Sequence, residues 1–126
     1  SDYTDNYYEY EIPLVLTPKG NYENDSQDDR KIVWPEKNMF NFYFSDLTEA
    51  KKQRNAENIS SVKEYYVQKG QNRITIKGNP SISDVRTIMI GIRNPKQSRN
   101  KLPDDGMAKS IEVWFNELRL AEFNEE

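Results

Sequence analysis

The decisive stretch of this sequence is Ser110-Ile111-Glu112-Val113-Trp114-Phe115-Asn116-Glu117-Leu118-Arg119-Leu120. Its first half alternates strictly, with apolar side chains at positions 111, 113 and 115, which is the period of a half-buried β-strand. The next apolar pair falls on the even positions 118 and 120, so the phase breaks near residues 116–117. We expect a β-bulge there, which lets the strand bend within a curved sheet.

The same alternation recurs elsewhere, between turn signals such as residues 69–72, and predicts further strands. These stretches are residues 8–16, 38–44, 73–78 and 87–93, with a shorter run at 32–35. Pro13 removes a ladder donor, so residues 8–16 form either an edge strand or a strand that breaks at the proline. Long helices between the strands are missing, which favours an antiparallel two-sheet β-sandwich, and we expect a galactose-binding-like jelly roll.

One short surface helix is expected over residues 47–54. Asp46 and Glu49 have the spacing of a capping box, and Ser45 is an alternative cap. Leu47 and Ala50 are its only apolar positions, so we expect it on the surface rather than in the core. Residues 17–31 are expected to be a long polar loop.

Composition limits the function classes. The chain has 126 residues, which is typical of one domain over residues 1–126, and it looks like a piece excised from a much larger protein. A net charge of -3 without a concentrated basic face argues against nucleic acid. The sequence has no cysteine and no histidine, which excludes thiolate chemistry, the common zinc sites and Ser-His-Asp triads. No run approaches the ~20 apolar residues of a membrane helix, so we expect no direct membrane insertion by this fragment. We also expect no cofactor.

Four polar or aromatic residues are candidates for an interface or a glycan site: Tyr7, Trp34, Trp114 and Asn116. Tyrosine and tryptophan anchor many interfaces, and their flat faces also suit sugar rings. Two of them have a structural alternative: Tyr7 would cover a sheet edge, and Trp114 would be buried under a helix or loop, for which the helix at 47–54 is available. The sequence leaves open whether Trp114 faces that helix or a partner.

Acidic residues give weaker signals. Asp25, Asp28 and Asp29 could offer oxygen ligands to calcium, but their spacing does not match the Asp-x-Asp-x-Asp-Gly loop, so a solvated acidic loop is favoured and no metal is expected. Nothing in the sequence places the carboxylate pairs at positions 9 and 11 or at 112 and 117 across a cleft, and outward-facing strand positions are normally charged. Without convergent perturbed groups we expect no enzyme.

Four stretches, read together, resemble a known family. They are residues 2–14, 33–36, 72–95 and 112–120. Their amino-acid sequences and their order resemble the SprA/Sov family of cell-surface proteins. Members of this family are the giant outer-membrane translocons of the type 9 secretion system in gliding and oral anaerobic bacteria. The resemblance spans most of this chain and would cover a small part of such a protein.

The resemblance implies a non-catalytic structural or protein-interaction module of an exported, outer membrane-associated translocon involved in protein export and gliding. Its implied partners are other segments of the parent translocon and the barrel and plug proteins that work with it. The alternative, taken from the strand pattern, is a carbohydrate-binding module of an exported bacterial protein, with a glycan as partner. The membrane side is left open.

Overall fold

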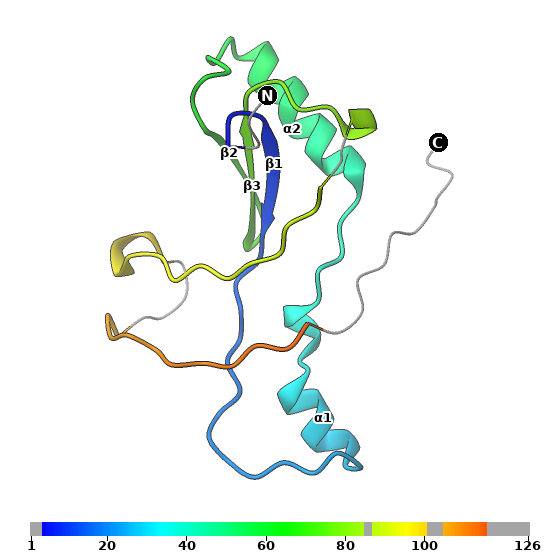
Figure 1. The fold of residues 1–126 in the computed structure, drawn as a ribbon, viewed down its shortest axis with the longest axis vertical. Helices are drawn as coiled ribbons and strands as arrows, with labels where there is room; N and C mark the ends of the chain where they lie inside the picture. The colour runs from blue at the N-terminus through cyan, green and yellow to red at the C-terminus, as the bar shows by residue number, and fades with distance from the viewer. Residues whose placement is uncertain (1–3, 85–86, 101–104, 116–126) are drawn as a thin grey trace. The chain divides into compact units, whose positions relative to one another are not determined.

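The computed structural model of the chain describes residues 4–84, 87–100 and 105–115. Contacts divide the chain into two compact units, Ser1–Asn94 and Pro95–Glu126. The regular structure of the first unit consists of β1 (Tyr7–Glu11), α1 (Gln27–Val33), α2 (Phe44–Ala56), β2 (Tyr65–Lys69) and β3 (Asn72–Lys77), with short 3-10 turns at Glu36–Asn38 and Ile82–Asp84 (Figure 1). In the second unit the described residues hold one 3-10 turn, Gln97–Arg99.

The three strands form one antiparallel sheet with the order β1-β3-β2. Both neighbours of β3 are antiparallel to it, with Tyr8 and Tyr65 opposite Ile76 and with Tyr10 and Val67 opposite Ile74. The β2–β3 connection turns at Gly70, whose φ of 61° is the left-handed value that a type II′ hairpin needs at its first central residue. β1 lies at one edge of the sheet and ends two residues before Pro13, as the proline predicts.

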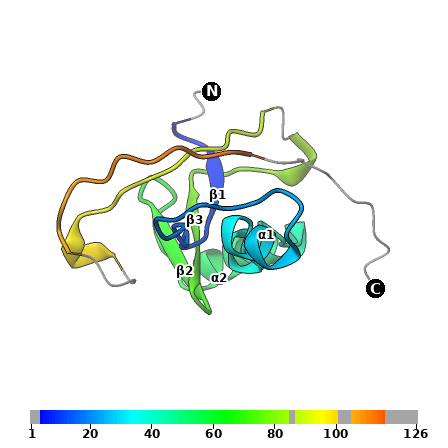
Figure 2. The same cartoon turned by 90° about the horizontal axis from the view of Figure 1, so that it is seen from below.

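Helix α2 covers one face of this sheet and supplies half of the buried core (Figures 1 and 2). Leu47 and Ala50 of the helix pack with Ile74 and Ile76 of β3, which are 1% and 0% exposed. Partly buried apolar side chains surround this cluster: Tyr8, Tyr10, Phe42, Tyr65, Val67 and Ile82. The predicted helix is therefore confirmed and longer than expected, but its placement away from the core was wrong, because two apolar positions suffice to seat a helix on a sheet.

The cap of α2 also differs from the prediction. The helix begins after Tyr43, and the Asp46 carboxylate reaches back to accept the Tyr43 backbone N–H at 3.3 Å. Asp46 is thus the third helical residue rather than the N-cap, and its negative charge also favours the positive end of the helix dipole.

The sandwich and jelly roll are not confirmed. The described residues contain one open three-stranded antiparallel sheet, and the face that a second sheet would cover in a sandwich is covered by α2. Residues 38–44, 87–93 and 111–115 are described without strand structure, so the strands predicted there are absent from this structure. The bulge expected at residues 116–117 lies outside the described residues, and the single domain over residues 1–126 stays a prediction.

A helix replaces the strand that was predicted over residues 32–35. Ser26 caps α1, and its hydroxyl oxygen accepts the Asp29 backbone N–H at 3.2 Å. Asp28 and Asp29 occupy the first turn and Arg30 and Lys31 the last, so the charges complement the helix dipole at both ends. The polar run expected to be a loop therefore carries its own helix signal.

Candidate functional site

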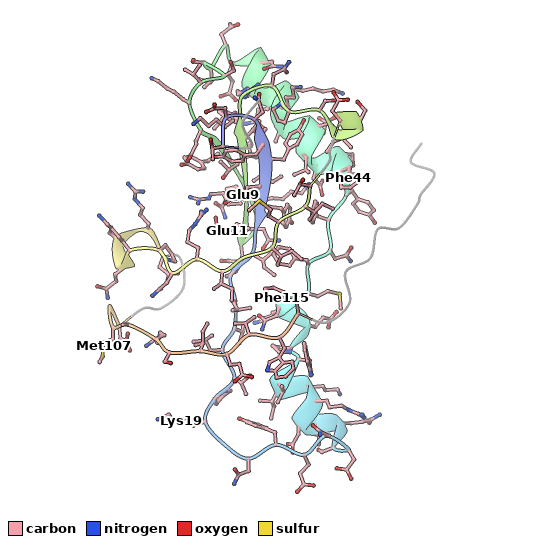
Figure 3. The ribbon with its side chains drawn as sticks, viewed as in Figure 1. Glu9, Glu11, Lys19, Phe44, Met107 and Phe115 are labelled. Carbon is pink, nitrogen blue, oxygen red and sulfur yellow. The ribbon has the colours of Figure 1, made fainter. Side chains whose placement is uncertain are left out.

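The face of the sheet opposite α2 is polar, and we refer to it as the polar face. Side chains alternate across a strand, so this face takes the residues that the core does not use. They are Tyr7, Glu9 and Glu11 of β1, Arg73, Thr75 and Lys77 of β3, and Tyr66 and Gln68 of β2. Figure 3 labels Glu9 and Glu11, which lie one pleat apart on β1.

Two arginines bridge the carboxylates of β1. Arg73 Nη2 donates to Glu11 Oε1 at 2.8 Å across the β1–β3 pair, and the two side chains are about one third exposed. Arg93 approaches from the segment after the sheet, with Nη2 3.1 Å from Glu9 Oε1 and Nη1 3.7 Å from Glu11 Oε1. Its hydrogen bond with Glu9 raises the pKa of Arg93 above the ordinary value. The charges on this face are therefore held in pairs.

A second bridge crosses the start of the sheet through Glu64. The Tyr7 hydroxyl donates to Glu64 Oε1 at 3.0 Å, and the Tyr66 hydroxyl donates to Glu64 Oε2. These two hydrogen bonds, that of Tyr66 first, lower the pKa of Glu64. Burial, followed by the hydrogen bond to Glu64, raises the pKa of Tyr7 to about 12. The Arg73 guanidinium lies over the Tyr66 ring, with its Cζ 4.6 Å from the ring centroid. This contact joins the two bridges.

Two buried side-chain polar atoms on the polar face have no hydrogen-bond partner among the described residues. They are Thr75 Oγ1 and Arg73 Nε, on the central strand. Thr75 is only 2% exposed, so its hydroxyl is enclosed by the side chains around it. A buried polar atom without a partner lowers the stability of the fold. The packing of the long side chains on this face therefore leaves some of their hydrogen-bonding groups unsatisfied.

A hollow of about 410 Å³ lies between α2 and the β2–β3 hairpin, on the other side of the sheet. It is lined by both charged and apolar residues: Asp46, Glu49, Ala50, Lys52, Gln53, Ala56, Val67, Lys69 and Ile74. Lys69 pairs with Asp46 at 2.5 Å, and Lys52 lies 3.6 Å from Glu49. Because these ionisable groups pair with one another, the hollow offers mixed recognition chemistry rather than a free acid and base.

The residues singled out in the sequence have different fates. Tyr7 belongs to the polar-face network through its hydrogen bond to Glu64. Trp34 is the C-cap of α1 and is 49% exposed. Its backbone N–H donates to Arg30 O at 2.7 Å. Trp114 lies in the second unit, outside any helix or strand, and is 71% exposed. The helix over residues 47–54, considered as a cover for it, packs its Leu47 and Ala50 against β3. Asn116 lies outside the described residues.

The acidic candidates serve local structure. Asp29 accepts the Glu23 backbone N–H at 2.9 Å, and Asp28 and Asp29 occupy the first turn of α1. In the parts of the chain that the structure describes, no group of three or more Asp, Glu, His or Cys side chains could hold a metal ion.

Sequence reasoning missed Glu64, Arg73 and Arg93 as members of the network. The alternation of Glu9 and Glu11 on β1 did indicate an outward charged face. Their partners could be found only from the antiparallel register, which sets Glu11 opposite Arg73, and from the later segment that brings Arg93 back.

Comparison with known proteins places the chain among motility-related and secretion proteins. A family model described as "Motility related/secretion protein", SprA_N, matches residues 1–126, and the chain belongs to this SprA/Sov family. No curated protein and no solved structure matches the chain. No helix among the described residues has the length and apolarity needed to cross a bilayer.

Proposed function

We propose that this chain is a non-catalytic structural and protein-interaction module of a type 9 secretion translocon, exported and associated with the outer membrane. The observation that carries the proposal is the family match over the whole chain, residues 1–126. Its partners are other segments of the parent translocon and the barrel and plug proteins beside it.

The chemistry of the polar face supports a role without catalysis. Glu9 and Glu11 both face arginine, and Glu64 accepts two tyrosine hydroxyls. An acid–base catalyst needs a group with a free proton or lone pair aimed at substrate, whereas these groups are occupied by one another. Such a network suits a rigid scaffold.

Exposed aromatic side chains support contact with another protein. Trp114 and Phe115 are 71% and 61% exposed and are neighbours in sequence. Tryptophan at the centre of an interface commonly contributes about 2 kcal/mol or more to binding. In the proposal this pair anchors the second unit to another part of the translocon.

The test is co-purification of the full-length parent with its barrel partner. Trp114→Ala should reduce recovery of the partner at least about tenfold, which corresponds to about 1.4 kcal/mol, while far-UV circular dichroism stays unchanged. Met107→Ala is the matched control, because Met107 lies in the same unit and is also exposed. Unchanged recovery with Trp114→Ala would overturn Trp114 as the anchor, and loss of fold would make it a core residue.

A carbohydrate-binding role is the second candidate, and the exposed indole of Trp114 is the observation that favours it. Flat aromatic faces stack on sugar rings without a deep pocket. Stabilisation of the chain by an oligosaccharide, abolished by Trp114→Ala, would support this role. A glycan array without binding would eliminate it and leave the protein interface.

The jelly-roll arrangement belongs to the proposal as well. Residues 111–115 keep the alternation of a strand, and Ile111, Trp114 and Phe115 are exposed. In the assembled translocon these residues would gain a strand partner from the parent protein, since an isolated strand has no ladder to stabilise it.

A further inference from the structure

Residues 87–93 have the sequence pattern of a strand but are not part of any strand in the structure. Their even positions are Ile88, Ile90 and Ile92, which are 49%, 44% and 50% exposed. Three half-exposed isoleucines that alternate along one short run are unusual in a folded unit, because completing their burial would remove further apolar surface from water. Packing of these three side chains against another part of the protein would therefore be favourable.

The end of this segment is already attached to the sheet. Arg93 pairs with Glu9 at 3.1 Å and with Glu11 at 3.7 Å, and all three residues lie in the same compact unit. Both carboxylates belong to the polar face. If residues 87–93 adopt strand geometry, Arg93 and the other odd positions turn to that face, and the three isoleucines turn to the face of Tyr8 and Tyr10.

The edge of β1 is open to receive it. Among the described residues β1 pairs with β3 alone, so its outer backbone groups have no ladder partner. Unpaired edges attract strands, and natural proteins cover them. On the apolar side of this edge Phe42 stacks on Tyr10 with 4.3 Å between ring centroids, and Ile82 packs on the core cluster. Isoleucines arriving there would extend an existing apolar layer.

The direction of the segment follows from the chain that precedes it, from its last residue and from its path in Figure 1. The Asn79 backbone N–H donates to Asn6 Oδ1 at 2.8 Å, which places the chain beside the start of β1. Arg93, the last residue of the segment, reaches Glu9 and Glu11, which lie in the middle and at the end of β1. Figure 2 shows residues 87–93, drawn in yellow-green, on the side of β1 away from α2. The segment therefore runs in the same direction as β1.

We propose that residues 87–93 add to the free edge of β1 as a fourth, parallel strand, with Ile88, Ile90 and Ile92 joining the apolar layer under Tyr8 and Tyr10. The Arg93 ion pairs hold the segment near its docking site. The occupant of the β1 edge is thus this chain's own segment, and the docked strand closes that edge to strands from other proteins.

Amide hydrogen exchange on the unmodified 126-residue chain tests the proposal directly. A docked parallel strand protects alternate amides of residues 88–93 at least about 100-fold relative to an unstructured peptide, as expected for hydrogen-bonded strand amides. Nuclear Overhauser contacts between the backbones of residues 88–92 and β1 should accompany the protection. Exchange of all these amides at the rate of an unstructured peptide would overturn the proposal.

A pair of neighbouring substitutions tests the predicted facing. Ile90→Ser removes a side chain from the apolar layer and should lower Tm by about 4–8 °C. Met89→Ser is the matched control, because Met89 is 71% exposed and faces the polar side in the docked strand. Its Tm should change by less than about 2 °C. Equal shifts for the two variants would contradict the facing.

The tether is tested separately by Arg93→Ala. Loss of the Glu9 and Glu11 pairs should reduce the exchange protection of residues 88–92 by about threefold, the fold-change expected when partly exposed ion pairs are lost. Arg99→Ala is the control, because Arg99 is an exposed arginine of the second unit. Identical protection in the two variants would remove Arg93 from the docking, and the exchange pattern of the unmodified chain would still decide whether the strand forms.

Discussion

Strand β3 and residues 87–93 have nearly the same sequence pattern and very different environments. In β3, Ile74 and Ile76 alternate with Arg73 and Thr75, and both isoleucines are fully buried. In residues 87–93 three isoleucines alternate in the same way and remain about half exposed. The difference lies in partners, because β3 has a strand on each side and a helix on one face. Alternation therefore specifies which side of a chain is apolar, and long-range pairing decides whether that side is buried.

The largest expected effect comes from deleting part of the buried side. Ile76→Ala should lower the free energy of unfolding by about 2–5 kcal/mol, because Ile76 is 0% exposed, packs with the core residues of α2 and has Tyr8 and Tyr65 opposite it on the two neighbouring strands. Ile111→Ala, at an exposed alternating position of the second unit, should cost less than about 0.5 kcal/mol. Urea unfolding followed by circular dichroism measures both. Similar losses would mean that Ile111 is buried in solution.

The next effect concerns the residue that follows β3. Gly78 has a φ of 75°, and a Cβ at this position would clash with the Asp5 backbone oxygen and with Asn6 Oδ1. Gly78→Ala combines left-handed strain with a backbone clash and should destabilise the chain by about 2–3 kcal/mol.

Gly70→Ala separates the two causes of that loss. Gly70 has a φ of 61°, but no atom of the described residues lies within 4 Å of the place where a Cβ would stand, so only the strain of about 1 kcal/mol remains. Both values come from the same urea experiment. Equal losses at the two glycines would show that the chain at Asp5 and Asn6 moves aside without cost.

A third prediction concerns the helix that distinguishes β3 from residues 87–93. Arg54 of α2 is only 2% exposed, and its Nη1 has no hydrogen-bond partner within the described part of the chain. A buried cation with an unpaired donor costs desolvation, so Arg54→Met, with a similar length and no charge, should raise the stability by about 1 kcal/mol. Arg30→Met on the exposed face of α1 should leave it within about 0.5 kcal/mol. A loss with Arg54→Met would show that the guanidinium is satisfied in solution.

Local signals predicted the parts of this fold that depend on local chemistry. The alternation at residues 8–11 and 73–77, the proline that ends β1, the turn at Gly70 and the helix at 47–54 are all confirmed. Helix α1 was missed although Ser26 and Asp29 give its N-cap signal, because the short helix has no buried residue and so no apolar period. The strand predicted at residues 38–44 was wrong because Phe42 meets the core through a ring stack on Tyr10, without a backbone ladder.

The polar-face network was predictable only in its outline. The outward carboxylates Glu9 and Glu11 follow from alternation, but Arg73 reaches Glu11 through a register that spans 62 residues of sequence. Arg93 is 84 residues from Glu9. Such pairs are set by the topology of the sheet, which sequence spacing does not specify.

The smallest expected effect tests the network at Tyr7. Its pKa is raised from 10.0 to about 12, mainly by burial and then by the hydrogen bond to Glu64. A folded pKa above the unfolded value means that this stabilisation is complete below pH 10 and is lost as the pH rises from 10 towards 12. Tyr7→Phe should cost at most about 1 kcal/mol at about pH 8, because the partner of this hydrogen bond, Glu64, is exposed to solvent.

The pH dependence distinguishes this hydrogen bond from general packing. The stability difference between Tyr7→Phe and the unmodified chain should shrink between pH 10 and 12, because the Tyr7 hydroxyl ionises in the unfolded chain over this range while the folded chain still holds it neutral beside Glu64. Urea unfolding at several pH values measures this difference, and ultraviolet titration should lose one high-pH tyrosine step in the variant. Equal stability of the two chains across this range would mean that Tyr7 contributes through its ring alone, because phenylalanine keeps the ring. In that case Glu64 would be held by Tyr66, and the start of β1 would depend on backbone pairing with β3 rather than on the polar face.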